Sequence, residues 1–170
     1  MAVLTASCVV SNYALIWLPN VKLMDLIVFV SGLKFGKLVG VLVGALTWVI
    51  YGLFNPYGFF LPIWLACIIG ETFYGLVGGV LRSVFREKFK LFFVPTVIAV
   101  LVTIIYDLWT NFVFAIMFAT DQQAFALMIA SGIPFMFIHT FANTVLFTLG
   151  TYPLSFAFDK VGTIFQGVET

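Results

Sequence analysis

Charge is scarce in this chain. Only 9% of its 170 residues are Asp, Glu, Lys or Arg, whereas soluble domains carry roughly 25%. Hydrophobic residues make up 63%. A chain with so few charged side chains cannot cover a water-facing surface. The composition therefore predicts an all-α, polytopic membrane protein that forms one domain over residues 1–170.

Residues that bind nucleic acids or metals, or that catalyse reactions, are also few. The net charge is +1, and the apolar spans are not separated by basic runs with interleaved aromatics, so nucleic-acid binding is not expected. The single histidine, His139, has no cysteine near it in sequence, so neither a metal site nor a cofactor is expected. Residues 32–38 lack the spacing of a phosphate-binding Walker loop. Ser131 and Thr140 near His139 lack an activating motif, and we do not expect an enzyme.

Polar breaks divide the chain into six apolar spans: residues 2–18, 24–33, 38–54, 59–81, 91–119 and 124–158. Most have the ~17 residues that cross a hydrocarbon core of ~30 Å, but 24–33 does not. Joining it to the next span would bury Lys34 and Lys37 at roughly 2.5 to 3.5 kcal/mol each. We therefore predict six transmembrane helices, of which the second is short and either tilted or partly buried.

The basic residues predict an orientation. With the N-terminus inside, only Lys22 lies outside. The residues that then face the cytoplasm are Lys34, Lys37, Arg82, Arg86, Lys88, Lys90 and Lys160. Because cytoplasmic loops are enriched in Lys and Arg, we predict that the chain lies in the cell membrane with both termini cytoplasmic. The outer segments are then 19–22, 55–58 and 120–123.

Two groups of glycines are expected to let helix backbones approach closely. They are Gly36, Gly40 and Gly44, at spacing four, and Gly75, Gly78 and Gly79.

Polar and aromatic side chains inside the spans form the candidate binding site. Trp48 and Asn55 share one helical face with Tyr51, and Trp64, Glu71 and Tyr74 share another. Asp107 with Asn111, and His139 with Asn143, are pairs one turn apart. The predicted substrate-binding residues are Trp48, Asn55, Trp64, Glu71, Tyr74, Asp107, Asn111, His139 and Asn143.

Two interpretations of these residues stay open. The tryptophans fit an interfacial aromatic belt as well as a pocket, and the polar groups fit either a satisfied network between helices or a ligand site. We count Glu71 and Asp107 as the two acids inside the spans, and no Lys or Arg inside the spans can pair with them. We expect Lys22, on the outer loop, to reach the mouth of the site at most. That count favours a ring compound bearing an amine-like or amidine-like nitrogen.

Several segments together resemble the substrate-binding S components of energy-coupling-factor (ECF) transporters. They are Ala2 and Ala6 near the start, PNVKLMDL (19–26), GLKFGKLVGVLVG (32–44), the Gly70-Glu71 pair and GIPFMFIHTFAN (132–143). The likeness covers most of the chain in order, length and helix number.

The resemblance implies a substrate-capture subunit that binds a vitamin-like micronutrient near the outer face and works with a transmembrane T component and two ATP-binding subunits. An Ala-x-x-x-Ala pattern on the first helix contacts the T component in this family. Ala2 and Ala6 match it, but Val10 stands where a third alanine would follow. Metal-transporting members begin with a histidine, so this Met-Ala-Val start argues against a metal substrate. The alternatives are a non-catalytic scaffold subunit of another membrane complex or an intramembrane enzyme.

Overall fold

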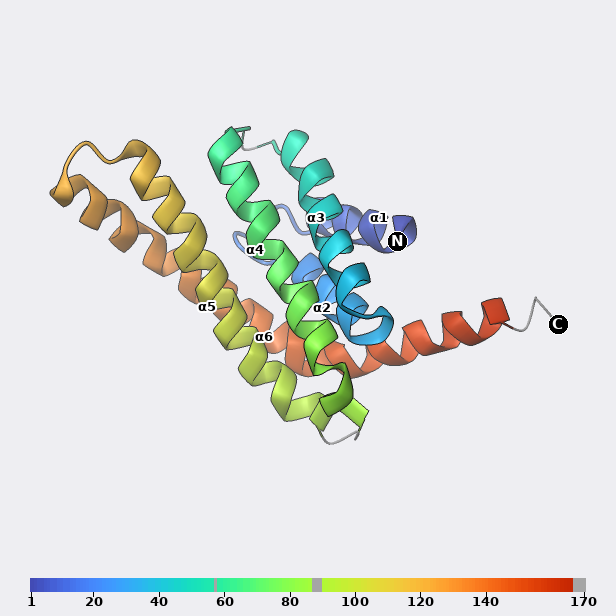
Figure 1. Cartoon of the computed structure of the whole chain (residues 1–170). Coiled ribbons are helices and arrows are strands. Elements are labelled where there is room, and N and C mark those ends of the chain that lie inside the picture. The colour runs from blue at the N-terminus through green and yellow to red at the C-terminus, as the bar shows by residue number, and fades with distance from the viewer. Residues whose placement is uncertain (57, 87–89, 167–170) are drawn as a thin grey trace.

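The structure, a computed structural model, consists of helices and connections throughout the part of the chain that it describes, residues 1–56, 58–86 and 90–166. The all-α prediction is confirmed for these residues. The elements, in chain order, are α1 (Ala2–Ala14), α2 (Leu23–Phe35), α3 (Lys37–Leu53), α4 (Leu61–Val80), the 3-10 helix η1 (Leu81–Arg86), α5 (Lys90–Phe118) and α6 (Gln122–Gln166) (Figure 1).

The helix bounds follow the predicted spans with two differences. The first helix ends at Ala14 rather than at residue 18, and hydrogen-bonded turns carry the chain from Leu15 to Val21. Pro19 adds to this break, because it disfavours a helical conformation at Leu18. The last helix continues to Gln166 and has 45 residues, which corresponds to about 67 Å. Its C-terminal part reaches beyond the other helices (Figure 1).

The prediction of six membrane spans is not confirmed. Among the described residues, three helices are long and apolar enough to cross a membrane: Leu61–Ser83, Phe93–Phe118 and Gln122–Lys160. Two further apolar helices, α1 and α3, are shorter.

The second helix has 13 residues and is short, as predicted. Residues 24–33 are all buried, and α2 contacts α1, α3, α4 and α6. A helix surrounded by protein need not match the thickness of the bilayer. It therefore provides the centre of the fold rather than a lipid-facing surface.

The glycines bring α2, α3 and α4 into backbone contact. A Cβ atom added to Gly40 would lie 2.6 Å from the carbonyl oxygen of Gly75, and one added to Gly44 would lie 2.9 Å from that of Glu71. A Cβ on Gly78 would meet the carbonyl oxygen of Phe29. Close helix approach at these positions is confirmed, since a methyl group there would overlap a neighbouring backbone.

Gly36 has a different role from its neighbours in the glycine ladder. It joins α2 to α3 with a φ of 97°, a left-handed conformation that residues with a Cβ rarely adopt. A Cβ built there would have only an Arg82 side-chain atom nearby, at 3.8 Å. Gly36 is thus needed for the turn and not for packing.

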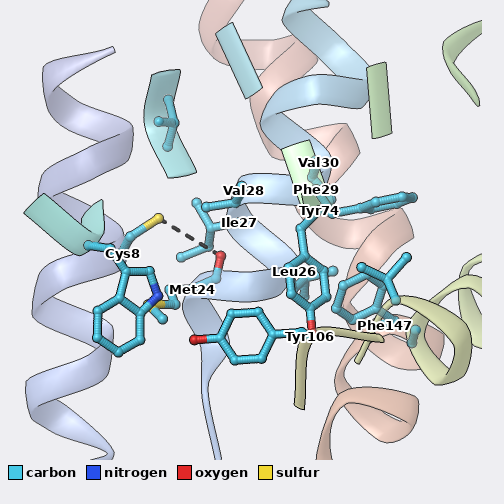
Figure 2. Packing of buried hydrophobic residues seen from close by; sticks show 14 of the residues in the cluster. Cys8, Met24, Leu26, Ile27, Val28, Phe29, Val30, Tyr74, Tyr106 and Phe147 are labelled. Atoms are coloured by element: carbon cyan, nitrogen blue, oxygen red, sulfur yellow. Dashed lines mark hydrogen bonds between the residues drawn. The ribbon is translucent and has the colours of Figure 1, made fainter. Parts of the chain in front are cut away.

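Apolar side chains of α2 pack against α4 and α6. The Phe29 and Phe147 rings lie 5.2 Å apart between centroids, and Tyr74 and Phe147 lie 6.1 Å apart. Figure 2 shows these rings beside Leu26, and the Cys8 thiol directed at the main chain of Met24. This core joins α2, α4 and α6 and so fixes the polar side chains that the same helices carry.

Candidate functional site

A buried polar network joins four helices at the centre of the fold. His139 on α6 lies between two carboxylates: its Nε2 is 2.8 Å from Asp25 Oδ2 on α2, and its Nδ1 is 3.0 Å from Asp107 Oδ1 on α5. A carboxylate accepts hydrogen bonds and does not donate them, so a ring with a proton on both nitrogens satisfies both contacts. The histidine therefore links α2 to α5 through charge-assisted bonds.

Asn143 extends this network to α4. Its Nδ2 donates to Asp25 Oδ2 at 2.7 Å and lies 3.0 Å from Thr103 Oγ1 and 3.3 Å from the Tyr74 hydroxyl. The Tyr74 hydroxyl donates to Thr103 Oγ1 at 2.9 Å. His139 and Asn143 are one turn apart on α6, so both reach the same carboxylate.

Glu71 lies beside this network and is fully buried. Trp48 Nε1 donates to Glu71 Oε2 at 3.3 Å, and the Asp25 carboxyl group is close enough to interact with that of Glu71. Within the described residues, Glu71 Oε1 and Asp25 Oδ1 have no hydrogen-bond partner. These two oxygens leave acceptor capacity next to the network.

Three cavities adjoin one another beside the connection between α1 and α2. The first, here the loop cavity, has a volume of about 520 Å³ and is lined by Asn12, residues 15–22, Trp48, Tyr51, Asn55 and Phe135.

The other two cavities lie against α4 and α5. The aromatic cavity, of about 350 Å³, is lined by Trp48, Gly52, Asn55, Gly58, Phe59, Phe60, Ile63, Trp64, Cys67, Phe114 and Phe118. The acid cavity, of about 220 Å³, is lined by Asn20, Lys22, Ile63, Cys67, Tyr106, Asp107, Thr110, Asn111, Phe114, Gly132, Phe135 and Met136. Each pair of cavities shares wall residues, so the three surround a common centre.

Lys22 lies at this centre, as a wall of both the loop cavity and the acid cavity. Its ammonium nitrogen is 5.4 Å from the ring centroid of Trp48 and 5.1 Å from that of Tyr106. Asp25, Asp107 and Glu71 attract it electrostatically. The expectation that Lys22 reaches only the mouth is wrong, because the chain turns inward after Pro19 and directs this side chain between α3 and α5.

The predicted site residues fall into two layers. The cavity walls include Trp48, Asn55, Trp64, Asp107 and Asn111. The fully buried layer beneath them contains Glu71, Tyr74, His139 and Asn143. Asp107 and Trp48 line cavities and also form hydrogen bonds with residues of the buried layer. They connect the cavities to the polar network.

Sequence reasoning missed one residue of the site, Asp25, and misplaced another, Lys22. Asp25 is a third acid inside the bundle and is fully buried, so the count of two was wrong. The signal was present, because Asp25 follows Met24 inside an apolar span. Lys22 supplies the cation that the sequence argument lacked. The case for a positively charged ligand based on unpaired acids therefore loses its premise.

No group of three or more His, Cys, Asp or Glu side chains suited to a metal ion occurs among the described residues.

Comparison with known proteins gives one match that covers most of the chain. The family model described as the substrate-specific component of ECF transporters matches residues 1–149. Neither a curated protein nor a solved structure matches the chain.

Proposed function

Since the chain belongs to the family of ECF transporter substrate-specific components, we propose that it captures a small, vitamin-like ring compound in the three adjoining cavities. Members of this family are substrate-binding transport subunits and not enzymes. The observation that supports the proposal is the set of cavities around Lys22, walled by aromatic rings and amides. The volume of the loop cavity by itself is already within the ~300 to 1,000 Å³ that is typical of small-molecule sites.

The two layers of polar residues have separate roles in this proposal. Trp48, Asn55, Trp64, Asp107 and Asn111 contact the substrate, because they line the cavities. The buried residues hold these contacts in place: His139 orients Asp107, and Glu71 orients the Trp48 indole. Tyr74 and Asn143 complete the support through Asp25.

The protein purified from cells grown in a complex medium is expected to carry one bound small molecule, identified by mass spectrometry of a denatured extract. In Asn55→Trp the added indole fills the wall shared by the loop and aromatic cavities, so the bound molecule should be lost while the melting temperature is retained. Wild-type protein that is empty after growth in several media contradicts capture. A molecule retained equally by Asn55→Trp places the site elsewhere.

We infer that the substrate is delivered through a transmembrane T component and two ATP-binding subunits. The family implies such partners in general, and the surface of α1 is suited to a helix. Ala2 and Ala6 are exposed and line an apolar groove of about 440 Å³ between α1 and α3. Val10 lines the same groove, so the missing third alanine still leaves an apolar position there. Small residues on an exposed helix face allow a partner helix to approach closely.

We further propose that the cavities face outward in the cell membrane and that both termini are cytoplasmic. Lys22 and Lys34 flank opposite ends of α2. Of the other basic residues behind this orientation, Lys88 lies outside the described residues. A cysteine at Gln122, which is exposed, should react with an impermeant maleimide on intact cells, whereas one at exposed Ser83 should react only after lysis. The native Cys8 and Cys67 are buried. The reverse labelling pattern contradicts the orientation.

A further inference from the structure

We propose that Lys22 and Asp107 together recognise the edge of a planar heterocycle that carries an acceptor oxygen beside a ring N–H, as in cyclic amides and imides. The proposal rests on the function proposed above and specifies the chemical class of the substrate. It begins from a lysine that the sequence argument placed outside the site and that the structure places at its centre.

The Lys22 ammonium is a donor without an acceptor. Within the described residues it forms neither a hydrogen bond nor an ion pair, and its contacts are with the faces of Trp48 and Tyr106. An ammonium group has three N–H donors. Ring faces attract its charge but do not accept hydrogen bonds from these donors in the way that an oxygen does. Because Lys22 lines two cavities, the missing acceptor is one that a bound molecule supplies.

The nearby acids explain why this lysine is held in place without being paired. Asp25, Asp107 and Glu71 all attract it, but among the described residues none of them forms an ion pair or a hydrogen bond with it. His139 engages Asp25 Oδ2 and both oxygens of Asp107. The acids thus hold the ammonium by charge at the junction of the cavities, and its N–H groups stay available to a molecule bound there. A carbonyl oxygen fits there.

Asp107 adds the matching acceptor. It lines the acid cavity together with Lys22, and a carboxylate has about four lone-pair sites, of which one imidazole N–H shared between the two oxygens uses only part. A donor and an acceptor on one cavity wall complement a C=O beside an N–H. They do not complement a carboxylate, which would meet Asp107 with like charge, or a quaternary ammonium, which offers no acceptor to Lys22.

The rings around the pair favour a flat ligand. The Tyr106 ring lies beneath the ammonium, and Phe114 and Phe135 line the same cavity. Trp48 lines the two adjoining cavities, and its indole N–H is already committed to Glu71. Aromatic walls bury the faces of a planar ring, and the polar pair is then left to read its edge.

The test measures equilibrium binding to the full chain in lipid nanodiscs. The probes are uracil, lumazine and riboflavin, three imide-bearing rings of increasing size, each beside its analogue methylated at every ring N–H. At least one imide ring should bind, and its methylated analogue should bind at least about tenfold more weakly, since Asp107 then faces a methyl group.

Lys22→Met should weaken binding of the imide ring by about tenfold or more, and Lys22→Arg by less than about threefold. The exposed Lys37 provides a matched control in Lys37→Met, which should bind like wild type.

A second readout separates recognition from damage to the fold. Lys22 contacts the carbonyl oxygen and Asp107 contacts the N–H group. Lys22→Met should therefore weaken binding of the imide ring and of its methylated analogue by the same factor, so that the ratio of their two dissociation constants is unchanged. Undiminished binding in Lys22→Met, equal binding of the methylated analogues, or no binding of any of the three rings overturns the proposal. A co-purified molecule that lacks an acceptor oxygen beside a ring N–H overturns this proposal but supports substrate capture. A protein that is empty after growth in all media contradicts both this proposal and substrate capture.

Discussion

Asp25→Ala is expected to destabilise the protein by about 3 to 5 kcal/mol, the cost typical of removing one partner of a buried ion pair. Asp25 is fully buried and accepts from His139 at 2.8 Å and from Asn143 at 2.7 Å. Its removal leaves both donors without this acceptor in a place that water does not reach. Thermal unfolding in detergent, followed by circular dichroism, measures the loss.

A surface ion pair provides the control for this prediction. Lys34 Nζ lies 2.7 Å from Asp159 Oδ2, with the Asp159 side chain 62% exposed. Asp159→Ala should cost no more than about 1 kcal/mol, because water screens the exposed pair. Equal losses in Asp25→Ala and Asp159→Ala contradict the claim that the buried network holds α2 to α6.

Ala6→Trp is expected to reduce substrate uptake in cells by at least about tenfold while leaving substrate capture by the isolated protein unchanged, because an indole prevents close helix approach. Ala6 is exposed and lines the groove between α1 and α3, on a different surface from the three cavities. Uptake of a radiolabelled form of the captured compound, measured beside its binding to purified protein, separates the two effects.

The neighbouring position tests whether the groove itself matters. Val3 is 78% exposed but does not line the groove, so Val3→Trp adds the same indole to α1 on another face and should leave uptake near the wild-type rate. If Ala6→Trp lowers binding and uptake together, Ala6 supports the fold and not the docking of a partner.

The helices were predictable from the sequence because apolar runs and their polar breaks are local signals. Gly40, Gly44 and Gly78 were likewise identified as contact positions, since glycine at spacing four or three leaves a flat helix face. The predicted number of membrane spans is not confirmed, because α1 and α3 are short and α2 is buried over residues 24–33. Hydropathy does not distinguish lipid from a protein core.

The candidate site was predictable in its residue types and not in its charge balance. Asp107 and His139 were identified because isolated polar residues in apolar spans are rare, and the structure brings them to 3.0 Å from each other. Lys22 was misplaced because its position depends on how the connection after Pro19 turns inward. That turn includes Asn20 at a φ of 54°, a tertiary feature that hydropathy does not reveal.

The glycine contacts also affect which parts of the site lose conformational entropy when a molecule binds. Where α3 meets α4, Gly40 and Gly75 bring backbone against backbone, so this supporting wall has no rotamers to restrict when a molecule enters. The connection between α1 and α2 differs, since Trp17 is 87% exposed and the long Lys22 side chain also lines the loop cavity. Fixing a side chain of this kind costs about 0.5 to 1.5 kcal/mol of conformational entropy. If a substrate binds in the cavities as proposed, part of the entropic penalty falls on the side chains of residues 15–22, whereas the backbone contact between α3 and α4 is already ordered.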